Sequence, residues 1–260
     1  MNKFFWQNKV IWITGASSGV GYQLAKTLLN TSCQLILSGR NINKLESLIN
    51  KNISTPPLIL AFDITDKNAC QIACETIKKQ FHHIDLLILN AGVCPYFDIN
   101  NFKSHIIEQT MLTNMLSSSY ILEHSLTMLR KSQNAIIVSI TSLASIAGLP
   151  FGMGGYSASK AALDKFMESL AIELYPEKIK VLTISPGFIN TPMAQKNPFV
   201  MPWIASPQKA VNKIIHAIEK KRSTTCFPKQ LSIIFRLTNL LPRKYYYKIM
   251  FYLSKRLKKD

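Results

Sequence analysis

Six short apolar runs, separated by helical segments, limit what this chain can fold into more than any other feature. Runs that are apolar throughout are typical of parallel strands covered on both faces. Their alternation with helices predicts an α/β fold with a doubly wound, mostly parallel sheet flanked by helices. We expect about seven strands, at 9–14, 33–38, 58–62, 85–90, 136–140, 180–185 and, more weakly, 224–228. Helices are expected at 43–50, 69–81, 104–129, 157–174 and 208–220.

The first run leads into a glycine-rich turn, TGASSGVG at residues 14–21, and a helical segment follows. Glycines between a strand and a helix let the backbone approach a pyrophosphate at the helix N-terminus, where free N–H groups favour anions. The spacing is G-x-x-x-G-x-G rather than G-x-G-x-x-G, and such a turn can also be purely structural. The strand–turn–helix context favours a Rossmann-like dinucleotide site. The residues expected to bind the cofactor here are Gly15, Ser17, Ser18, Gly19, Val20 and Gly21.

The residues after the second and third runs bear on the choice of cofactor. An acidic residue after the second strand of a dinucleotide fold binds the 2′-hydroxyl of NAD, whereas an arginine accommodates the 2′-phosphate of NADP. Here Gly39 leaves room and Arg40 offers a planar, bidentate donor, which predicts NADP(H). The alternative is an exposed loop arginine. Asp63 and Ile64 are expected near the adenine, although Asp63 can also be a helix N-cap.

The segment 142–160 carries the groups with the clearest potential for chemistry. Tyr156 and Lys160 are four residues apart, so on a helix they share one face. An ammonium group nearby favours a phenolate, so we expect the pKa of Tyr156 to fall from about 10 toward working pH. This predicts a general acid or base, with Ser142 binding the same substrate atom. A Tyr/Lys pair at this spacing is also common on solvated helix faces.

Taken together, these motifs resemble the short-chain dehydrogenase/reductase family over about residues 8–227. The likeness rests on T-G-x-x-x-G-x-G at 14–21, N-A-G at 90–92, an asparagine at 114, the Ser142/Tyr156/Lys160 set and P-G-x-x-x-T at 186–191. Ser142 lies one residue further from Tyr156 than is common in relatives. Thr141 and Ser145 are therefore neighbouring candidates for the role of Ser142.

The resemblance implies four catalytic residues. Tyr156 would exchange a proton with the substrate oxygen, which Ser142 holds. Lys160 would lower the pKa of Tyr156 and bind the nicotinamide ribose, and Asn114 would hold a water that connects Lys160 to solvent. The cofactor-binding residues implied in addition are Asn90, Ala91, Gly92, Tyr156, Lys160, Pro186, Gly187, Ile189 and Thr191. A homodimer or homotetramer is also implied.

Composition argues against a metal site, a secreted protein and a membrane-spanning protein. The five cysteines contain no C-x-x-C pair and the histidines are scattered, so no metal site is predicted and free thiols in a reducing, cytoplasmic compartment are expected. The N-terminus lacks the features of a secretory signal. No apolar run reaches the roughly 18 residues that suggest a spanning helix.

Residues 188–208, named here the substrate loop, contain four prolines, which exclude a long regular helix. The family keeps its substrate loop at this place. Met193, Phe199, Met201 and Trp203 suit a lid over a small hydrophobic carbonyl or alcohol substrate. The alternative is that these side chains pack on the body or on a partner subunit.

The chain divides into an expected catalytic domain, 1–228, and a basic C-terminal extension, 229–260. The net charge is +17, and the last 52 residues carry +12 of it. Tyr246, Ile249, Leu253 and Leu257 recur at helical spacing with lysines mostly elsewhere, which is typical of a helix on an anionic membrane surface. The alternative is a helix packed on the body. Nucleic acid is disfavoured, because no recognised binding motif accompanies the charge.

The sequence therefore predicts an NADP(H)-dependent oxidoreductase that interconverts a carbonyl and an alcohol on a hydrophobic or lipid-like substrate. The alternative is a non-catalytic nucleotide-binding scaffold or sensor, held at a membrane surface by its basic tail. The intact catalytic set argues against the scaffold, since a scaffold has no use for a phenol with a tuned pKa.

Overall fold

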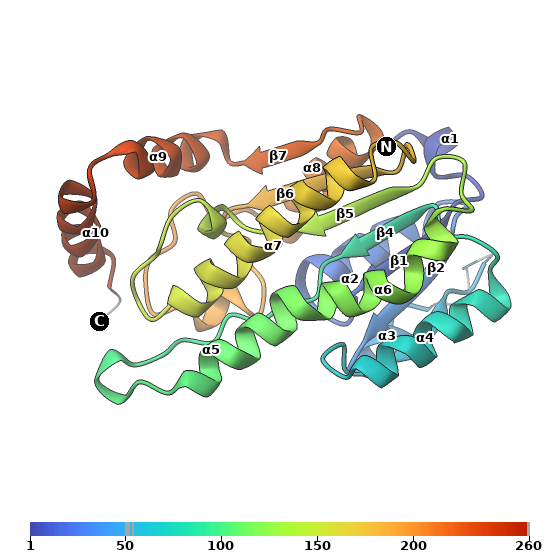
Figure 1. The fold of residues 1–260 in the computed structure, drawn as a ribbon, viewed down its shortest axis with the longest axis horizontal. Helices are drawn as coiled ribbons and strands as arrows, with labels where there is room; N and C mark the ends of the chain where they lie inside the picture. The colour runs from blue at the N-terminus through green and yellow to red at the C-terminus, as the bar shows by residue number, and fades with distance from the viewer. Residues whose placement is uncertain (50–52, 54, 259–260) are drawn as a thin grey trace.

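A computed structural model describes residues 1–260 except 50–52, 54, 259 and 260. Its centre is one seven-stranded sheet in the order β3-β2-β1-β4-β5-β6-β7, and every neighbouring pair is parallel (Figure 1). The strands are β1 Val10–Thr14, β2 Gln34–Gly39, β3 Leu58–Ala61, β4 Leu86–Leu89, β5 Ile136–Ile140, β6 Lys180–Pro186 and β7 Thr224–Phe227. The predicted doubly wound fold and its seventh strand are confirmed.

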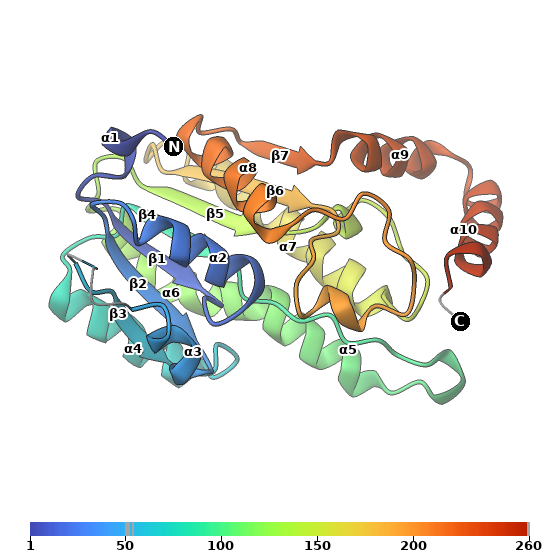
Figure 2. The same cartoon turned by 180° about the vertical axis from the view of Figure 1, so that it is seen from behind.

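Helices cover both faces of the sheet. Successive residues of a strand point to opposite faces, so a strand that is apolar throughout has apolar side chains to bury on both of them. In β1, Ile11 and Ile13 belong to one hydrophobic core, while Val10 and Trp12 belong to the other. The helices are α1 Lys3–Trp6, α2 Gly19–Leu28, α3 Ile42–Glu46, α4 Lys67–Gln80, α5 Ser104–Met111, α6 Ser117–Leu129, α7 Gly154–Glu173, α8 Pro207–Glu219, α9 Lys229–Leu240 and α10 Arg243–Leu257. The first core includes side chains of α2 and α8, and the second includes side chains of α4, α6 and α7 (Figures 1 and 2).

Two helices differ from their predicted forms. The helix predicted at 43–50 is the five-residue α3, Ile42–Glu46, and position 50 lies outside the described residues. The long helix predicted at 104–129 is interrupted by a π-helical segment, η2 Leu112–Leu116. Such segments often mark functional positions, and this one carries Asn114 at its centre.

The strand order reverses between β1 and β4, and ligands of open α/β sheets bind at the carboxyl ends of the strands at such a point. Short 3₁₀ turns, η1 Ile99–Asn101, η3 Leu143–Ser145 and η4 Ala194–Lys196, lie in the loops. After β7 the chain continues past this end of the sheet as α9, and α10 then turns across the same end (Figure 1). Among the described residues, no helix combines the length and the apolar character needed to cross a bilayer.

Candidate active site

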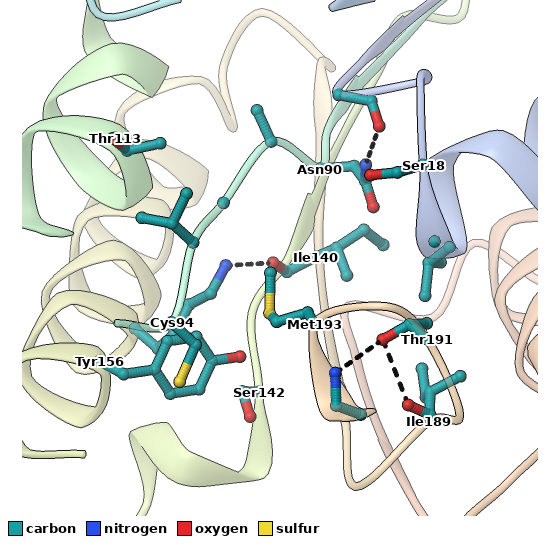
Figure 3. A pocket seen from close by; sticks show the side chains of 18 of the residues that line it. Ser18, Asn90, Cys94, Thr113, Ile140, Ser142, Tyr156, Ile189, Thr191 and Met193 are labelled. Carbon is teal, nitrogen blue, oxygen red and sulfur yellow. Dashed lines mark hydrogen bonds between the residues drawn. The ribbon is translucent and has the colours of Figure 1, made fainter. Parts of the chain in front are cut away.

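A cavity of about 960 Å³ opens at the carboxyl edge of the sheet and collects almost all of the predicted site residues (Figure 3). Two predicted residues, Gly21 and Asn114, do not line it. Those that do are Gly15, Ser17, Ser18, Gly19, Val20, Arg40, Asp63, Ile64, Asn90, Ala91, Gly92, Ser142, Tyr156, Lys160, Pro186, Gly187, Ile189 and Thr191.

The glycine turn has the geometry of an anion cradle. Gly15 and Gly19 have φ of +66° and +57°, a conformation that favours glycine. A Cβ on Gly15 would lie 2.8 Å from the Ala91 Cα, so no larger residue fits there. α2 begins at Gly19, and the side chain of its N-cap, Ser18, makes no capping hydrogen bond. Backbone N–H groups at this helix start can therefore receive a pyrophosphate, which is the fit that a dinucleotide requires.

Asn90 supports this turn from the end of β4. Its side-chain amide donates to the carbonyl of Thr14 at 2.9 Å and to that of Gly15 at 3.1 Å. A Cβ on Gly21 would lie 2.4 Å from both the Asn90 Nδ2 and the Gly15 carbonyl oxygen. Gly21 thus serves the turn by leaving space for Asn90. Sequence reasoning assigned no role to Thr14, whose hydroxyl donates to the Ile88 carbonyl at 3.2 Å and accepts from the Asn90 N–H at 3.0 Å.

Arg40 and Asp63 mark the end of the cavity where the adenosine is expected. Both side chains are exposed, and their charged groups are 3.9 Å apart. Burial acts to raise the pKa of Asp63, but hydrogen bonds from Thr65 and the charge of Arg40 outweigh it and lower the pKa. Asp63 is not a helix N-cap: Asp66 caps α4 instead, accepting from two of its backbone N–H groups. A Cβ on Gly39 would lie 2.9 Å from the Ser17 hydroxyl, so Gly39 brings the first and second strand ends together.

Ser142, Tyr156 and Lys160 meet at the other end of the cavity. Ser142 follows β5 and its hydroxyl accepts from the Ala144 N–H at 3.1 Å, which caps η3. Tyr156 lies in the first turn of α7, and its hydroxyl points toward Ser142 (Figure 3). Lys160, one turn later, is almost fully buried, and its ammonium donates to the Ile140 carbonyl at 2.9 Å. One strand, β5, and one helix, α7, therefore place these groups: the helix sets Tyr156 and Lys160 one turn apart, and the packing of the two elements brings Ser142 to them.

The expected lowering of the Tyr156 pKa is wrong for this arrangement. Burial raises the pKa of Tyr156, and this outweighs the hydrogen bond from Ser142, which acts to lower it. Burial also lowers the pKa of Lys160 from 10.5 to about 8. The Lys160 Nζ lies 6.0 Å from the centre of the Tyr156 ring and is directed to the backbone of β5. The phenol is therefore protonated and can donate.

The two alternatives to Ser142 are less well placed. The Thr141 hydroxyl is buried, 2.8 Å from that of Ser185. Ser145 does not line the cavity. The Ser142 hydroxyl, by contrast, faces the Tyr156 phenol (Figure 3).

Asn114 lies behind the cavity wall, fully buried in the π-helical segment. Its Oδ1 accepts from the Val93 N–H at 2.7 Å, and its Nδ2 donates to the Val93 carbonyl at 2.9 Å and to the Ser159 hydroxyl at 2.8 Å. A Cβ on Gly92 would lie 3.2 Å from Asn114 Oδ1 and 3.3 Å from the Lys160 Nζ. Asn114 thus ties the loop after β4 to α7 and reaches the neighbourhood of Lys160.

Several lining residues were missed by sequence reasoning. Cys94 lies beside Tyr156, and burial raises the pKa of its thiol to about 11 (Figure 3). The Tyr96 hydroxyl donates to the Asn197 Oδ1 of the substrate loop. From the C-terminal extension, α9 adds Leu231 and Phe235 to the wall. In the sequence these residues stand in no recognisable motif.

The large side chains of the substrate loop have different surroundings. Met193 lines the cavity. Phe199 is buried, stacked on Phe151 at 4.6 Å between ring centres and set edge-on to Phe188 at 5.7 Å. Trp203 is half exposed. The packing alternative therefore holds for Phe199, while Met193 lies at the cavity, where a lid residue is expected.

A glycine cradle for a dinucleotide and a Ser–Tyr–Lys set in one cavity define a nicotinamide-dependent oxidoreductase of the Rossmann-like class. A family model described as short chain dehydrogenase matches residues 9–199. The chain belongs to this family, whose members interconvert carbonyl and alcohol groups.

Individual relatives agree with this family assignment. The chain is 31% identical over 242 residues to a fatty acyl-CoA reductase of Acinetobacter baylyi, covering 89% of this chain and 80% of the relative. A short chain dehydrogenase of Burkholderia phymatum, solved in complex with NAD, superposes with a TM-score of 0.81 at 20% identity over 92% of this chain and 94% of its own. One from Burkholderia cenocepacia, solved with NADP, has a TM-score of 0.79 at 22% identity over 94% and 98% of the two chains. At these identities the two structures show the shared fold.

Proposed function

We propose that this protein is an NADP(H)-dependent oxidoreductase that interconverts a carbonyl and an alcohol on a hydrophobic or lipid-like substrate. The observation that carries the proposal is that the Tyr156 hydroxyl faces Ser142 in the cavity that also contains the glycine turn. A substrate oxygen between the two hydroxyls would be close enough to exchange a proton with one and to be held by the other.

When bound, the nicotinamide supplies or accepts the hydride. In the reducing direction, Tyr156 donates its proton to the carbonyl oxygen, while the Ser142 hydroxyl donates a hydrogen bond that polarises the same carbonyl. Burial keeps the Tyr156 phenol protonated, which suits it to this step. Lys160 would contact the nicotinamide ribose and assist reprotonation of Tyr156, and Asn114 holds the backbone of the loop after β4 beside it.

The preference for NADP(H) rests on Arg40. Its guanidinium is exposed at the adenosine end of the cavity, and only Asp63 is within ion-pair distance of it in the described chain. It is therefore available to a 2′-phosphate. Solved relatives contain either NADP or NAD, so this choice depends on local residues rather than on the fold.

An apolar substrate is supported by the wall around Tyr156. Side chains from the segment after β5, the start of α7 and the substrate loop give this end of the cavity a largely apolar surface. They are Leu143, Leu149, Met153, Phe188 and Met193. The name of the Acinetobacter relative, a fatty acyl-CoA reductase, points to the same substrate class.

We further propose that residues 1–228 form the catalytic domain, to whose cavity α9 adds Leu231 and Phe235, and that the extension 229–260 also makes peripheral contact with an anionic membrane. The expected apolar face of α10 is partly occupied: Tyr246 is buried and Leu257 is half-buried. The membrane contact would therefore involve the outer face, where Tyr245, Tyr252 and Lys248 are exposed. Aromatic and basic side chains together suit a lipid interface, and each basic residue contributes on the order of 1 kcal/mol there. A homodimer or homotetramer is proposed from the family alone.

The test of the proposed function is turnover of NADPH with a panel of apolar aldehydes and ketones. Tyr156→Phe should abolish turnover while NADPH binding, followed by its fluorescence, stays intact. Tyr175→Phe, which alters a highly exposed tyrosine of the loop after α7, is the matched control and should behave like the wild type. Activity that survives in Tyr156→Phe removes the assigned acid. A wild type that binds NADPH but turns over nothing supports the non-catalytic scaffold instead.

A further inference from the structure

The C-terminal extension contributes directly to the cavity. Leu231 and Phe235 of α9 both line it, and their four-residue spacing places them one turn apart on the same helix face. Leu231 is buried and Phe235 is half-buried. Their neighbour Ile233 is exposed and does not line the cavity. One face of α9 therefore belongs to the site.

The contacts of Leu231 show where this wall, the α9 face that carries Leu231 and Phe235, lies relative to the reacting groups. A Cβ built on Gly187 would lie 3.1 Å from Leu231 Cδ2 and 3.4 Å from Leu143 Cδ1. Gly187 follows β6, and Leu143 follows Ser142 directly. α9 also packs against η3, the short helix that Ser142 caps. The α9 face is therefore adjacent to the Ser142 side of the site, with Phe235 one turn further from β7.

The wall is held at both ends. At its start, α9 follows β7, and the Arg236 guanidinium lies 3.8 Å from the Cys226 sulfur. Beyond its end, the Tyr246 hydroxyl of α10 donates to the Gly148 carbonyl at 2.5 Å, in the loop before α7. The Val200 N–H of the substrate loop donates to the Leu257 carbonyl of α10 at 2.8 Å. The extension thus connects the two loops that border the cavity.

We infer that Leu231 and Phe235 determine substrate specificity by binding the apolar part of the substrate remote from its carbonyl. This inference rests on the proposed function. With the carbonyl between Ser142 and Tyr156, an alkyl chain that extends along the α9 face meets Leu231 first and Phe235 second. Phe235 therefore limits the length of chain that the site accepts, and shortening its side chain lengthens the preferred substrate.

The experiment compares kcat/KM for butanal, octanal and dodecanal, and for the matching 2-alkanones, with NADPH. We expect Phe235→Ala to raise the ratio of kcat/KM for the longest to the shortest substrate by about tenfold, the effect of a contact or clash of ordinary size. Phe235→Trp should move the ratio in the opposite direction. Ile233→Ala, on the outer face of the same helix, should leave it unchanged. Equal ratios in the wild type and both Phe235 variants would overturn the inference.

A binding measurement separates this inference from the proposed function. Calorimetry of butanol and dodecanol with the NADPH-loaded protein reports on the α9 face without turnover, because a reduced cofactor cannot take a hydride from an alcohol. If no aldehyde or ketone is reduced but Phe235→Ala still changes the ratio of the two affinities, the proposed function fails and the wall assignment stands. If the affinity ratio does not respond either, the wall assignment fails as well. Phe235→Leu replaces Phe235→Ala if the latter does not fold.

Discussion

Replacing Lys160 with methionine should change how the stability of the cofactor-free protein depends on pH. Lys160 is 4% exposed, and burial lowers its pKa from 10.5 to about 8. The difference between these two values corresponds to about 3 kcal/mol by which the folded state disfavours the ammonium form. Methionine has a similar length and no charge, so Lys160→Met removes this penalty. It also removes the hydrogen bond to the Ile140 carbonyl, a constant loss of about 1 kcal/mol.

The direction in which the free energy of unfolding changes with pH depends on which state binds more protons. Between pH 8 and 10.5 the unfolded chain keeps the lysine proton and the folded protein releases it. The unfolded state then binds more protons, so the free energy of unfolding of the wild type rises with pH. Below about pH 8 both states are protonated and the penalty is present in full. Relative to Lys160→Met, the wild type should therefore gain about 2 kcal/mol between pH 7 and pH 9.5.

The assay is urea unfolding at both pH values and one protein concentration, followed by tryptophan fluorescence. Groups that titrate in both proteins cancel in the difference between them. Lys209→Met, which removes an exposed lysine of α8, is the control and should show a difference from the wild type that does not change with pH. A difference between the wild type and Lys160→Met that stays constant from pH 7 to 9.5 would refute the reasoning, because the buried ammonium would then carry no penalty.

Three further predictions follow from other parts of the molecule. Gly21→Ala should lower the free energy of unfolding by about 1–3 kcal/mol and weaken NADPH binding, because its Cβ would lie 2.4 Å from the Asn90 Nδ2 and from the Gly15 carbonyl oxygen. Urea unfolding and NADPH titration measure the two effects, and Gly148→Ala, whose Cβ meets open space, is the control that should show neither. Arg40→Ala should raise the Kd for NADPH by about tenfold or more and leave that for NADH nearly unchanged, since a charged hydrogen bond contributes about 1.5–3 kcal/mol; equal losses would remove the case for NADP. Lys244→Glu combined with Lys248→Glu should reduce sedimentation with anionic liposomes, while uncharged liposomes sediment little of either protein; unchanged sedimentation would contradict the membrane contact.

Much of the fold could be predicted because its signals are local. Apolar runs such as Ile136–Ile140 are strands because both of their faces are covered, and alternation with helices leaves few ways to arrange a parallel sheet. Where the local signal was ambiguous the prediction was less exact. The helix after Arg40 is shorter than predicted, and the turn around Asn114 is π-helical rather than α-helical.

The candidate site also has features that local sequence predicts and features that it does not. The glycine turn, Arg40 and the Tyr156/Lys160 pair were predictable because each depends on neighbours within one strand, turn or helix. The ionisation of Tyr156 was not, because it depends on how deeply the folded chain buries the phenol and on where the Lys160 ammonium points. Leu231 and Phe235 were also not predictable as wall residues, since a helical repeat does not say which face meets which neighbour.

By itself, the sequence determined the order of strands and helices, the glycine cradle and the identity of the groups that can transfer a proton. These features depend on residue types at short spacing, where backbone geometry leaves little choice. Tertiary structure alone decided that Tyr156 is protonated, that Gly21 makes room for Asn90, and that α9 completes the cavity beside Ser142. Burial and contact between distant segments arise only when the chain is packed, and no local pattern encodes them.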